Sequence, residues 1–268
     1  MDFKFSKSEE VIQKVAREFA EKEVAPLAEE IDKSGRFPEE TFNKMVKCGF
    51  TGIGVPVEYG GSGGDDITKV IVVSEIGKKC GATAAILSIH GIFGQTILRF
   101  GTEEQKQKYL PLVSNGGKKT AFALTEPNAG SDAAAVKTVA VSDGDDYVIT
   151  GTKCFITGGN LADYVIVFAS TDPTKGVKGM SSIVVPKGTP GFSVGKVEHK
   201  MGIRASQTAE LIFDGCRVPK ENLVGKEGQG FKIAMVGLDG ARIGVASQAL
   251  GIAEGALEES VSYMKERV

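Results

Sequence analysis

The chain contains few of the residues that build metal centres and disulfide frameworks. Among its 268 residues there are two histidines, four cysteines and no tryptophan, and no C-x-x-C pair occurs. A zinc site would therefore lack the ligand spacing that such sites use. The cysteines, at positions 48, 80, 154 and 216, are widely scattered. This scatter favours packed, reduced thiols over a set of disulfides.

Neither an excess of positive charge nor a long apolar run stands out. The formal net charge is −2, from 32 basic and 34 acidic residues, and no strongly basic segment occurs. This balance argues against nucleic-acid binding. The first residues are charged, without the apolar centre of a signal peptide, and no segment approaches a membrane span. We expect a soluble cytoplasmic protein that binds a small ligand, with no nucleic-acid or membrane partner.

Two nucleotide-binding motifs are also missing. Neither G-x-G-x-x-G nor G-x-x-x-x-G-K-[ST] occurs in the sequence. Helical and strand-like segments do not alternate along the chain, so a doubly wound parallel sheet is disfavoured. A dinucleotide, if one binds, is therefore not held in the Rossmann manner.

The first part of the chain has the periodicity of helices. Ser6 and Glu9 form a capping box before an amphipathic run with apolar residues at helical spacing. Two long apolar helices are expected over residues 66–79 and 82–99. Thr102 then begins another capping box before a short helix.

From about residue 119 the periodicity becomes that of strands. Short apolar runs follow one another, separated by turns rich in glycine, aspartate and proline. This pattern predicts a small barrel or sandwich of about 100 residues. The runs cover residues 121–124, 139–141, 147–149, 165–168, 182–185, 192–194 and 211–213.

The helical period returns near the end of the chain, with helices expected over residues 231–236 and 242–265. The order of helices, a compact β unit and helices again predicts a multi-domain α+β protein. We expect an N-terminal all-α domain over residues 1–118 and a central small β-barrel over residues 119–223. Residues 224–268 would be the first helices of an incomplete C-terminal α domain.

The run from Phe122 to Asp132, Phe-Ala-Leu-Thr-Glu-Pro-Asn-Ala-Gly-Ser-Asp, is the most informative segment. It starts as a strand and breaks sharply at Pro127. Such a loop exposes backbone N–H groups and the hydroxyls of Thr125 and Ser131 at a rigid strand end, which suits a large polar ring system or a phosphate. An ordinary turn is the alternative, because proline, asparagine and glycine are common in turns.

Three motifs in a fixed order carry a family resemblance. They are Leu-Thr-Glu-Pro-Asn-Ala-Gly-Ser-Asp at 124–132, Gly-Thr-Lys-Cys-Phe-Ile-Thr-Gly-Gly-Asn at 151–160, and Met-Gly-Ile-Arg-Ala-Ser at 201–206 with Glu-Gly-Gln-Gly-Phe at 227–231. In order and spacing they resemble the flavin-dependent acyl-CoA dehydrogenases, most closely the short-chain, butyryl-CoA-type branch. The likeness extends over the whole chain.

The resemblance implies a function and its partners. Members of the family use FAD to introduce an α,β double bond into an acyl-CoA thioester and pass the electrons to an electron-transfer flavoprotein. A short-chain acyl-CoA substrate and a homotetramer are implied as well. A carboxylate removes the α-proton and the β-hydrogen leaves as a hydride to the flavin.

The resemblance also assigns residues to the FAD site. Phe155 is suited to stack on one face of the flavin, and Thr125 and Thr157 are suited to hydrogen-bond its polar edge. Taken alone, Phe155 would read as a core aromatic. The cofactor-binding residues implied in this way are Phe122, Leu124, Thr125, Gly130, Ser131, Phe155, Ile156 and Thr157.

A second set of residues is implied for the substrate. The segment Leu-Asp-Gly-Ala-Arg at 238–242 resembles the part of the family that contacts CoA. Arg242 is suited to an anionic or amide-rich tail, although a surface ion pair with Asp239 is the plainer interpretation. The substrate-binding residues implied are Ser131, Asp239, Gly240, Ala241 and Arg242.

The general base is the point at which the sequence departs from the family. Some branches place this glutamate on the helix near position 241, which is alanine here, and most place it in a later helical region. The chain stops inside an expected helix, so we expect a truncated or incomplete chain with little turnover and weak FAD binding. The catalytic residue stays unknown. Glu126 lies in the flavin loop, but its Thr-Glu-Pro context favours a role in shaping the turn.

Two other functions remain open. The absent base favours a non-catalytic flavin- or CoA-binding fragment or scaffold. An acyl-CoA oxidase on the same framework differs in oxygen access, which the residues do not reveal. His90 lies in an apolar helix whose face would look toward the acyl pocket, and a satisfied core histidine is the alternative interpretation.

Overall fold

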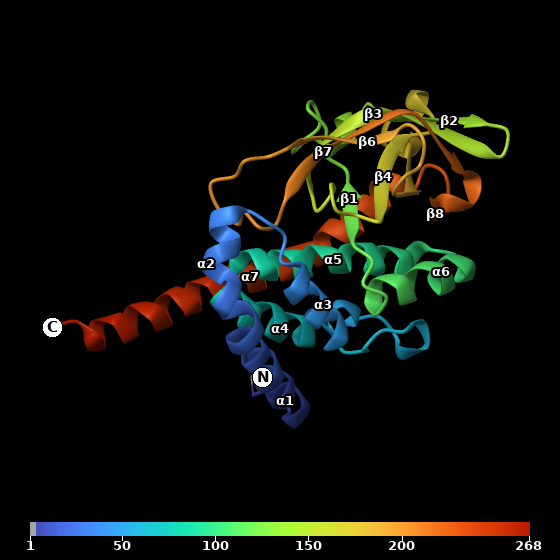
Figure 1. Ribbon diagram of the computed structural model, residues 1–268. Coiled ribbons are helices and arrows are strands. Elements are labelled where there is room, and N and C mark those ends of the chain that lie inside the picture. The colour runs from blue at the N-terminus through green and yellow to red at the C-terminus, as the bar shows by residue number, and fades with distance from the viewer. Residues whose placement is uncertain (1–3) are drawn as a thin grey trace.

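Helices form the first part of the molecule and lie against a twisted sheet (Figure 1). The structure is a computed structural model that describes residues 4–268. The charged start of the chain, which argued against a signal peptide, lies partly outside these residues. The helices are α1 (Lys7–Phe19), α2 (Ala25–Ser34), α3 (Glu39–Lys47), α4 (Asp66–Lys79), α5 (Gly81–Phe100) and α6 (Glu103–Ser114).

Local signals in the sequence explain where these helices begin. The side chain of Ser6 accepts from the backbone N–H of Glu9, and the Glu9 carboxylate accepts from that of Ser6, as the capping box predicts. Thr102 makes the same reciprocal pair with Gln105 at the start of α6. A π-helical turn over Ala20–Val24 joins α1 to α2, next to Pro26, which has no N–H to donate.

The middle of the chain forms one eight-stranded sheet in the order β6-β7-β3-β2-β4-β5-β8, with β1 paired to β4. β1 pairs with β4 in parallel and β2 joins the same edge of β4 further along, while β5 pairs antiparallel along the other edge. The strands are β1 (Thr120–Ala123), β2 (Val139–Asp143), β3 (Asp146–Thr157), β4 (Tyr164–Ser170), β5 (Met180–Pro186), β6 (Phe192–Val197), β7 (Thr208–Pro219) and β8 (Leu223–Val224).

Alternate residues of β4 belong to two different cores. Val165 and Val167 pack with side chains from β3, β5 and β7 inside the curled sheet. Ile166 and Phe168 point the other way and pack against α5, α6 and α7. Because successive side chains of a strand face opposite sides, a strand buried on both sides reads as the continuous apolar run seen here. A third core lies among α1 to α5.

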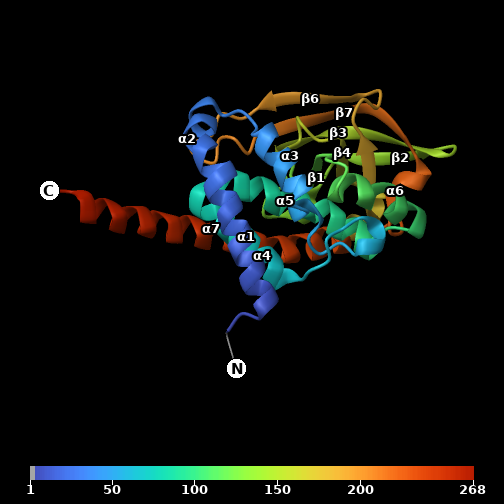
Figure 2. The same cartoon turned by 60° about the horizontal axis from the view of Figure 1, so that its bottom comes forward.

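The last helix, α7 (Gly230–Glu266), runs beneath the sheet and along α4 and α5, and its C-terminal part extends beyond the rest of the molecule (Figures 1 and 2). Gly251 and Gly255 allow α4 to come close, since a Cβ atom at either position would overlap backbone atoms of α4. Ser74 of α4 donates a hydrogen bond to the backbone oxygen of Ser247 at 3.1 Å.

The expected fold class is confirmed: a helical unit, a β unit and the start of a second helical part follow in this order. The domain boundaries proposed at residues 118/119 and 223/224 stay a prediction. All four cysteines are free thiols.

Three details differ from expectation. Residues 230–266 form one helix instead of two, because packing on α4 and α5 outweighs the roughly 1 kcal/mol that each of Gly237 and Gly240 costs a helix. β3 and β7 are twelve residues long, since they pair with each other along most of their length. We also expected no segment that approaches a membrane span, and this was wrong for α5. This helix is long and apolar enough to cross a membrane, although 67% of its apolar 18-residue stretch is buried in the structure.

Candidate functional site

The loop after β1 and the last part of β3, which are far apart in the sequence, are joined by hydrogen bonds. The backbone N–H of Cys154 donates to the carbonyl oxygen of Thr125 at 2.9 Å. The ammonium of Lys153 donates to the carbonyl oxygen of Leu124 at 3.1 Å. The two motifs that carry the family resemblance therefore meet in space, through backbone atoms as well as side chains.

Glu126 holds the first of these loops in place. Its carboxylate accepts hydrogen bonds from the backbone N–H groups of Lys137 at 2.7 Å and Thr138 at 3.0 Å, and from the Lys153 ammonium at 2.7 Å. Burial alone would raise the pKa of this carboxyl, but the charge of Lys153 and these hydrogen bonds outweigh it and lower the pKa. The side chain is engaged on all sides, which fits its expected role in shaping the turn.

Lys153 is a buried partner of this loop that the sequence analysis missed. Its side chain is completely buried. Burial lowers its pKa to about 8, while the Glu126 carboxylate acts in the opposite direction. The available signal was a single charge inside the otherwise apolar strand segment after Gly151, since a lysine is rarely buried unless it is paired.

Phe155 has an unusual backbone and an exposed ring. Its φ angle is 57°, in the left-handed region that bulky residues avoid, and the residue is 64% exposed. The pairing of β3 with β7 shifts register between Lys153 and Ile156, so a bulge turns Phe155 outward while Ile156 stays in the core. The plainer interpretation of Phe155 as a core aromatic is wrong.

The polar groups around Phe155 have spare hydrogen-bonding capacity. The hydroxyls of Thr125 and Thr157 are half-buried and make no hydrogen bond to any other residue in the range 4–268. Gly130 and Ser131 are exposed, and a Cβ at Gly130 would meet nothing within 4 Å. An exposed aromatic face, free hydroxyls and open backbone fit the flavin ring of FAD.

Phe122 and Leu124, also expected at the cofactor, lie partly inside the protein. The Phe122 ring packs on Phe168 with centroids 4.7 Å apart and lies against Gly237 of α7. Leu124 is buried. Phe122 and Leu124 therefore pack beneath the loop, and the exposed surface is formed by the loop residues that follow them.

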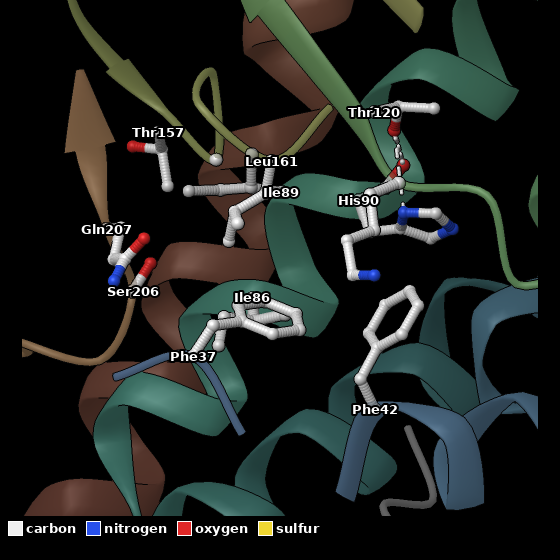
Figure 3. A pocket seen from close by; sticks show the side chains of 12 residues that line it. Phe37, Phe42, Ile86, Ile89, His90, Thr120, Thr157, Leu161, Ser206 and Gln207 are labelled. Atoms are coloured by element: carbon white, nitrogen blue, oxygen red, sulfur yellow. Dashed lines mark hydrogen bonds between the residues drawn. The ribbon is translucent and has the colours of Figure 1, made fainter. Parts of the chain in front are cut away.

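Thr157 lines a pocket at the junction of the helical unit and the sheet (Figure 3). Thr125 is not among the residues that line it. His90 lies here, fully enclosed, with its Nε2 atom 2.8 Å from the carbonyl oxygen of Val113 and its ring edge-on to Phe42. Burial lowers the pKa of His90. This agrees with the interpretation of His90 as a core histidine. His90 is not among the residues that line the pocket next to Ala241, which is described below.

A second pocket lies between α4, α5 and α7 and encloses about 460 Å³ of empty space, including its open mouth. Gly240 and Ala241, two of the residues expected to bind substrate, form part of its wall. Its other lining residues are Asp66, Lys69, Gly91, Ile92, Gln95, Thr96, Arg99, Phe100, Val236 and Gly237. The sequence analysis gave no role to Lys69, Gln95 or Arg99, because only the packing of three helices brings them together.

Asp239 and Arg242 lie on the outside of α7. Both side chains are highly exposed, and the Nε atom of Arg242 is 3.8 Å from Oδ1 of Asp239. Such an exposed pair contributes little to stability, so both groups are available to a ligand. The structure brings Gly240 and Ala241 into one pocket and leaves Asp239 and Arg242 on the surface of the same helix.

Models of one family match nearly the whole chain. The acyl-CoA dehydrogenase N-terminal domain matches residues 6–117, the middle domain residues 121–216, and the C-terminal domain residues 228–268.

Known proteins show the same similarity. The acryloyl-CoA reductase (NADH) of Anaerotignum propionicum is 62% identical over 100% of this chain and 68% of its own length. The solved butyryl-CoA dehydrogenase of Megasphaera elsdenii is 46% identical with a TM-score of 0.96, over 100% of this chain and 71% of that one. A chain from a solved structure of the electron transferring flavoprotein of Acidaminococcus fermentans is 52% identical with a TM-score of 0.98, over the same shares.

Proposed function

Because this chain belongs to the acyl-CoA dehydrogenase family, we propose that it is an FAD-dependent oxidoreductase of short-chain acyl-CoA thioesters. It removes hydrogen from the α and β carbons of the substrate and passes the electrons to an electron-transfer flavoprotein. The single observation that carries the proposal is the hydrogen bond that joins the loop at Thr125 to Cys154 of β3, with the Phe155 ring exposed beside it.

The residues of the two loops have distinct roles toward the cofactor. FAD, when bound, supplies the hydride acceptor. Phe155 would cover one face of the ring, and the hydroxyls of Thr125 and Thr157 would donate hydrogen bonds to its polar edge. The buried pair of Glu126 and Lys153 fixes the distance between the two loops, so this wall is preorganised before the ligand arrives.

The pocket between α4, α5 and α7 receives the acyl group. Gly240 leaves open space beside the helix, since a Cβ there would meet nothing within 4 Å. Asp239 and Arg242, on the exposed face of α7, are placed to meet the CoA portion, with the Arg242 guanidinium suited to phosphate. The solved butyryl-CoA dehydrogenase that the chain resembles supports a short acyl group.

The same similarity supports a proposal for the electron acceptor. The likeness to a chain solved with the electron transferring flavoprotein of Acidaminococcus fermentans supports that class of protein as the electron acceptor. We propose a homotetramer in the cytoplasm.

The same chemistry runs in the reverse direction in a relative. The acryloyl-CoA reductase of Anaerotignum propionicum is 62% identical to this chain. This favours a second candidate activity, the reduction of a short 2-enoyl-CoA, on the same loops and the same pocket.

A third candidate is a flavin- and CoA-binding protein without turnover. The observation that favours it is Ala241, which lines the pocket and has no proton-accepting group. Glu126 is engaged in three hydrogen bonds and is 6% exposed. We therefore assign the general base to no residue of this chain.

One assay separates the two catalytic candidates from binding without turnover. The purified protein is saturated with FAD without oxygen, and butyryl-CoA is added while the flavin absorbance is followed. Bleaching of the oxidised flavin band, and its recovery on adding crotonyl-CoA, is expected for either catalytic candidate, because the half-reaction with the flavin runs in both directions. A perturbed but unbleached spectrum with both ligands supports binding without turnover, and an unchanged spectrum contradicts the proposal.

A further inference from the structure

Lys69 separates two pockets on the helical side of the molecule. It lines the pocket that contains Gly240 and Ala241, between α4, α5 and α7. It also lines a smaller pocket behind, whose other walls are mostly apolar and are formed by Phe50, Thr51, Ile53, Val73, Leu87 and Gly91. Gly91 is the other residue that the two pockets share. The long side chain of Lys69 therefore forms much of the partition between them.

The Lys69 side chain lies beside glycines of both neighbouring helices. The Lys69 ammonium would be 3.6 Å from a Cβ at Gly91 of α5, and its Cε atom would be 3.6 Å from a Cβ at Gly244 of α7. The aliphatic stem thus lies in the crevice where α4, α5 and α7 meet.

The charge at this position is not neutralised by a close partner. Among residues 4–268, no carboxylate lies within 4.0 Å of the Lys69 ammonium and no hydrogen bond engages it. Asp66, one helical turn earlier, is the acidic group that acts on it, and burial lowers the pKa of Lys69. Arg99, the other cation of this pocket, is exposed. The end of the pocket at Lys69 is therefore a poor place for additional methylene groups.

We propose that Lys69 is the specificity-determining residue that ends the acyl pocket and restricts the substrate to short acyl chains. The proposal rests on the proposed function, since it takes the pocket at Gly240 and Ala241 as the acyl site. An acyl chain that reaches Lys69 meets an ammonium in place of the apolar walls of Phe50, Val73 and Leu87 that lie beyond it. Without the lysine side chain the two pockets would join.

The test measures acyl-CoA binding by isothermal titration calorimetry, using the purified full chain incubated with FAD. Butyryl-CoA and hexanoyl-CoA are compared in the wild type and in Lys69→Ala. Each newly buried methylene gives about a fourfold gain in affinity. Hexanoyl-CoA has two more methylenes than butyryl-CoA, so the ratio of hexanoyl-CoA to butyryl-CoA affinity should rise by about fifteenfold in Lys69→Ala.

Three further variants separate volume, charge and general effects. Lys69→Arg keeps a long cationic side chain and should keep the wild-type ratio. Lys69→Met removes the charge but keeps most of the volume, so its ratio should lie between those of the wild type and Lys69→Ala. Lys79→Ala makes the same change on α4 away from this pocket and should leave the ratio unchanged.

An unchanged ratio in Lys69→Ala, with butyryl-CoA still bound, would overturn this inference and leave the proposed function intact. Tighter wild-type binding of glutaryl-CoA than of butyryl-CoA, lost in Lys69→Met, would overturn it too, because Lys69 would then be a ligand for a carboxylate. A wild-type protein that binds none of these thioesters would contradict the proposed function itself, and this inference with it.

Discussion

The ammonium of Lys153 lies 2.7 Å from a carboxylate oxygen of Glu126, and both side chains are buried. This ion pair joins the loop after β1 to the outer part of β3, where the cofactor wall is proposed. The remaining hydrogen bonds of the Glu126 carboxylate come from backbone N–H groups. A buried charge with several fixed partners holds a loop in one geometry, and its loss leaves the opposite charge uncompensated.

Removing one member of this pair should destabilise the protein strongly. Lys153→Met leaves the Glu126 carboxylate buried without its cation, so we expect a loss of about 3 kcal/mol in the free energy of unfolding. Urea denaturation measures it. The double variant Lys153→Met with Glu126→Gln should recover part of the loss, because no unpaired charge remains. A loss below about 1 kcal/mol, typical of a surface pair, would contradict this account.

The same pair predicts a loss of stability in acid. The pKa of Glu126 is lowered in the folded protein, whereas an unfolded glutamate titrates near about 4.3. Its contribution is therefore fully present above that value and is lost as the pH falls through the folded pKa. The difference in unfolding free energy between wild type and Glu126→Gln should shrink as the pH falls through the folded pKa of Glu126. A difference that grows as the pH falls would refute the assignment.

Two glycines of α7 should respond in opposite ways to alanine. A Cβ at Gly251 would overlap the backbone of Ser74 in α4, so Gly251→Ala should cost about 1–3 kcal/mol of stability. Gly240 faces open space, so Gly240→Ala should stabilise the helix by up to about 1 kcal/mol. Thermal unfolding of both variants provides the comparison. Equal effects would contradict the described packing of α7 on α4.

The backbone at Phe155 should carry strain that serves ligand binding. Phe155 and Ile203 both have positive φ angles, 57° and 51°. Replacing either by glycine should relieve a strain of roughly 1–2 kcal/mol. Phe155→Gly should also weaken FAD binding, whereas Ile203→Gly, outside the proposed wall, should not. Denaturation without ligand and FAD titration measure the two effects separately, and equal FAD affinities in both variants would remove Phe155 from the cofactor site.

The sequence predicted those parts of the molecule that depend on local signals. The capping boxes at Ser6 and Thr102 appear as expected, since a cap needs only residues three positions apart. The order of helices and strands followed from periodicity. The motifs around Thr125 and Phe155 directed attention to two loops, and the structure joins them by the hydrogen bond from Cys154 to Thr125.

What the sequence did not reveal depends on contacts between distant segments. The sequence did not predict the burial and pairing of Lys153, because its partner Glu126 is 27 positions away. The bulge that exposes Phe155 arises from the register between β3 and β7. The position of Lys69 in a pocket could not be predicted, because it depends on the packing of α5 and α7 around α4. The continuity of α7 through Gly237 and Gly240 likewise depends on its packing against neighbouring helices.

The most direct test of the central claim is a titration of FAD with the purified protein, followed by flavin fluorescence and visible absorbance. If the loops at Thr125 and Thr157 form one wall for the ring, FAD should bind with quenched fluorescence and a perturbed visible band. Phe155→Ala should restore much of the fluorescence. The account would be contradicted if, with protein in large excess, the spectrum of FAD remained that of the free cofactor in both the wild type and Phe155→Ala.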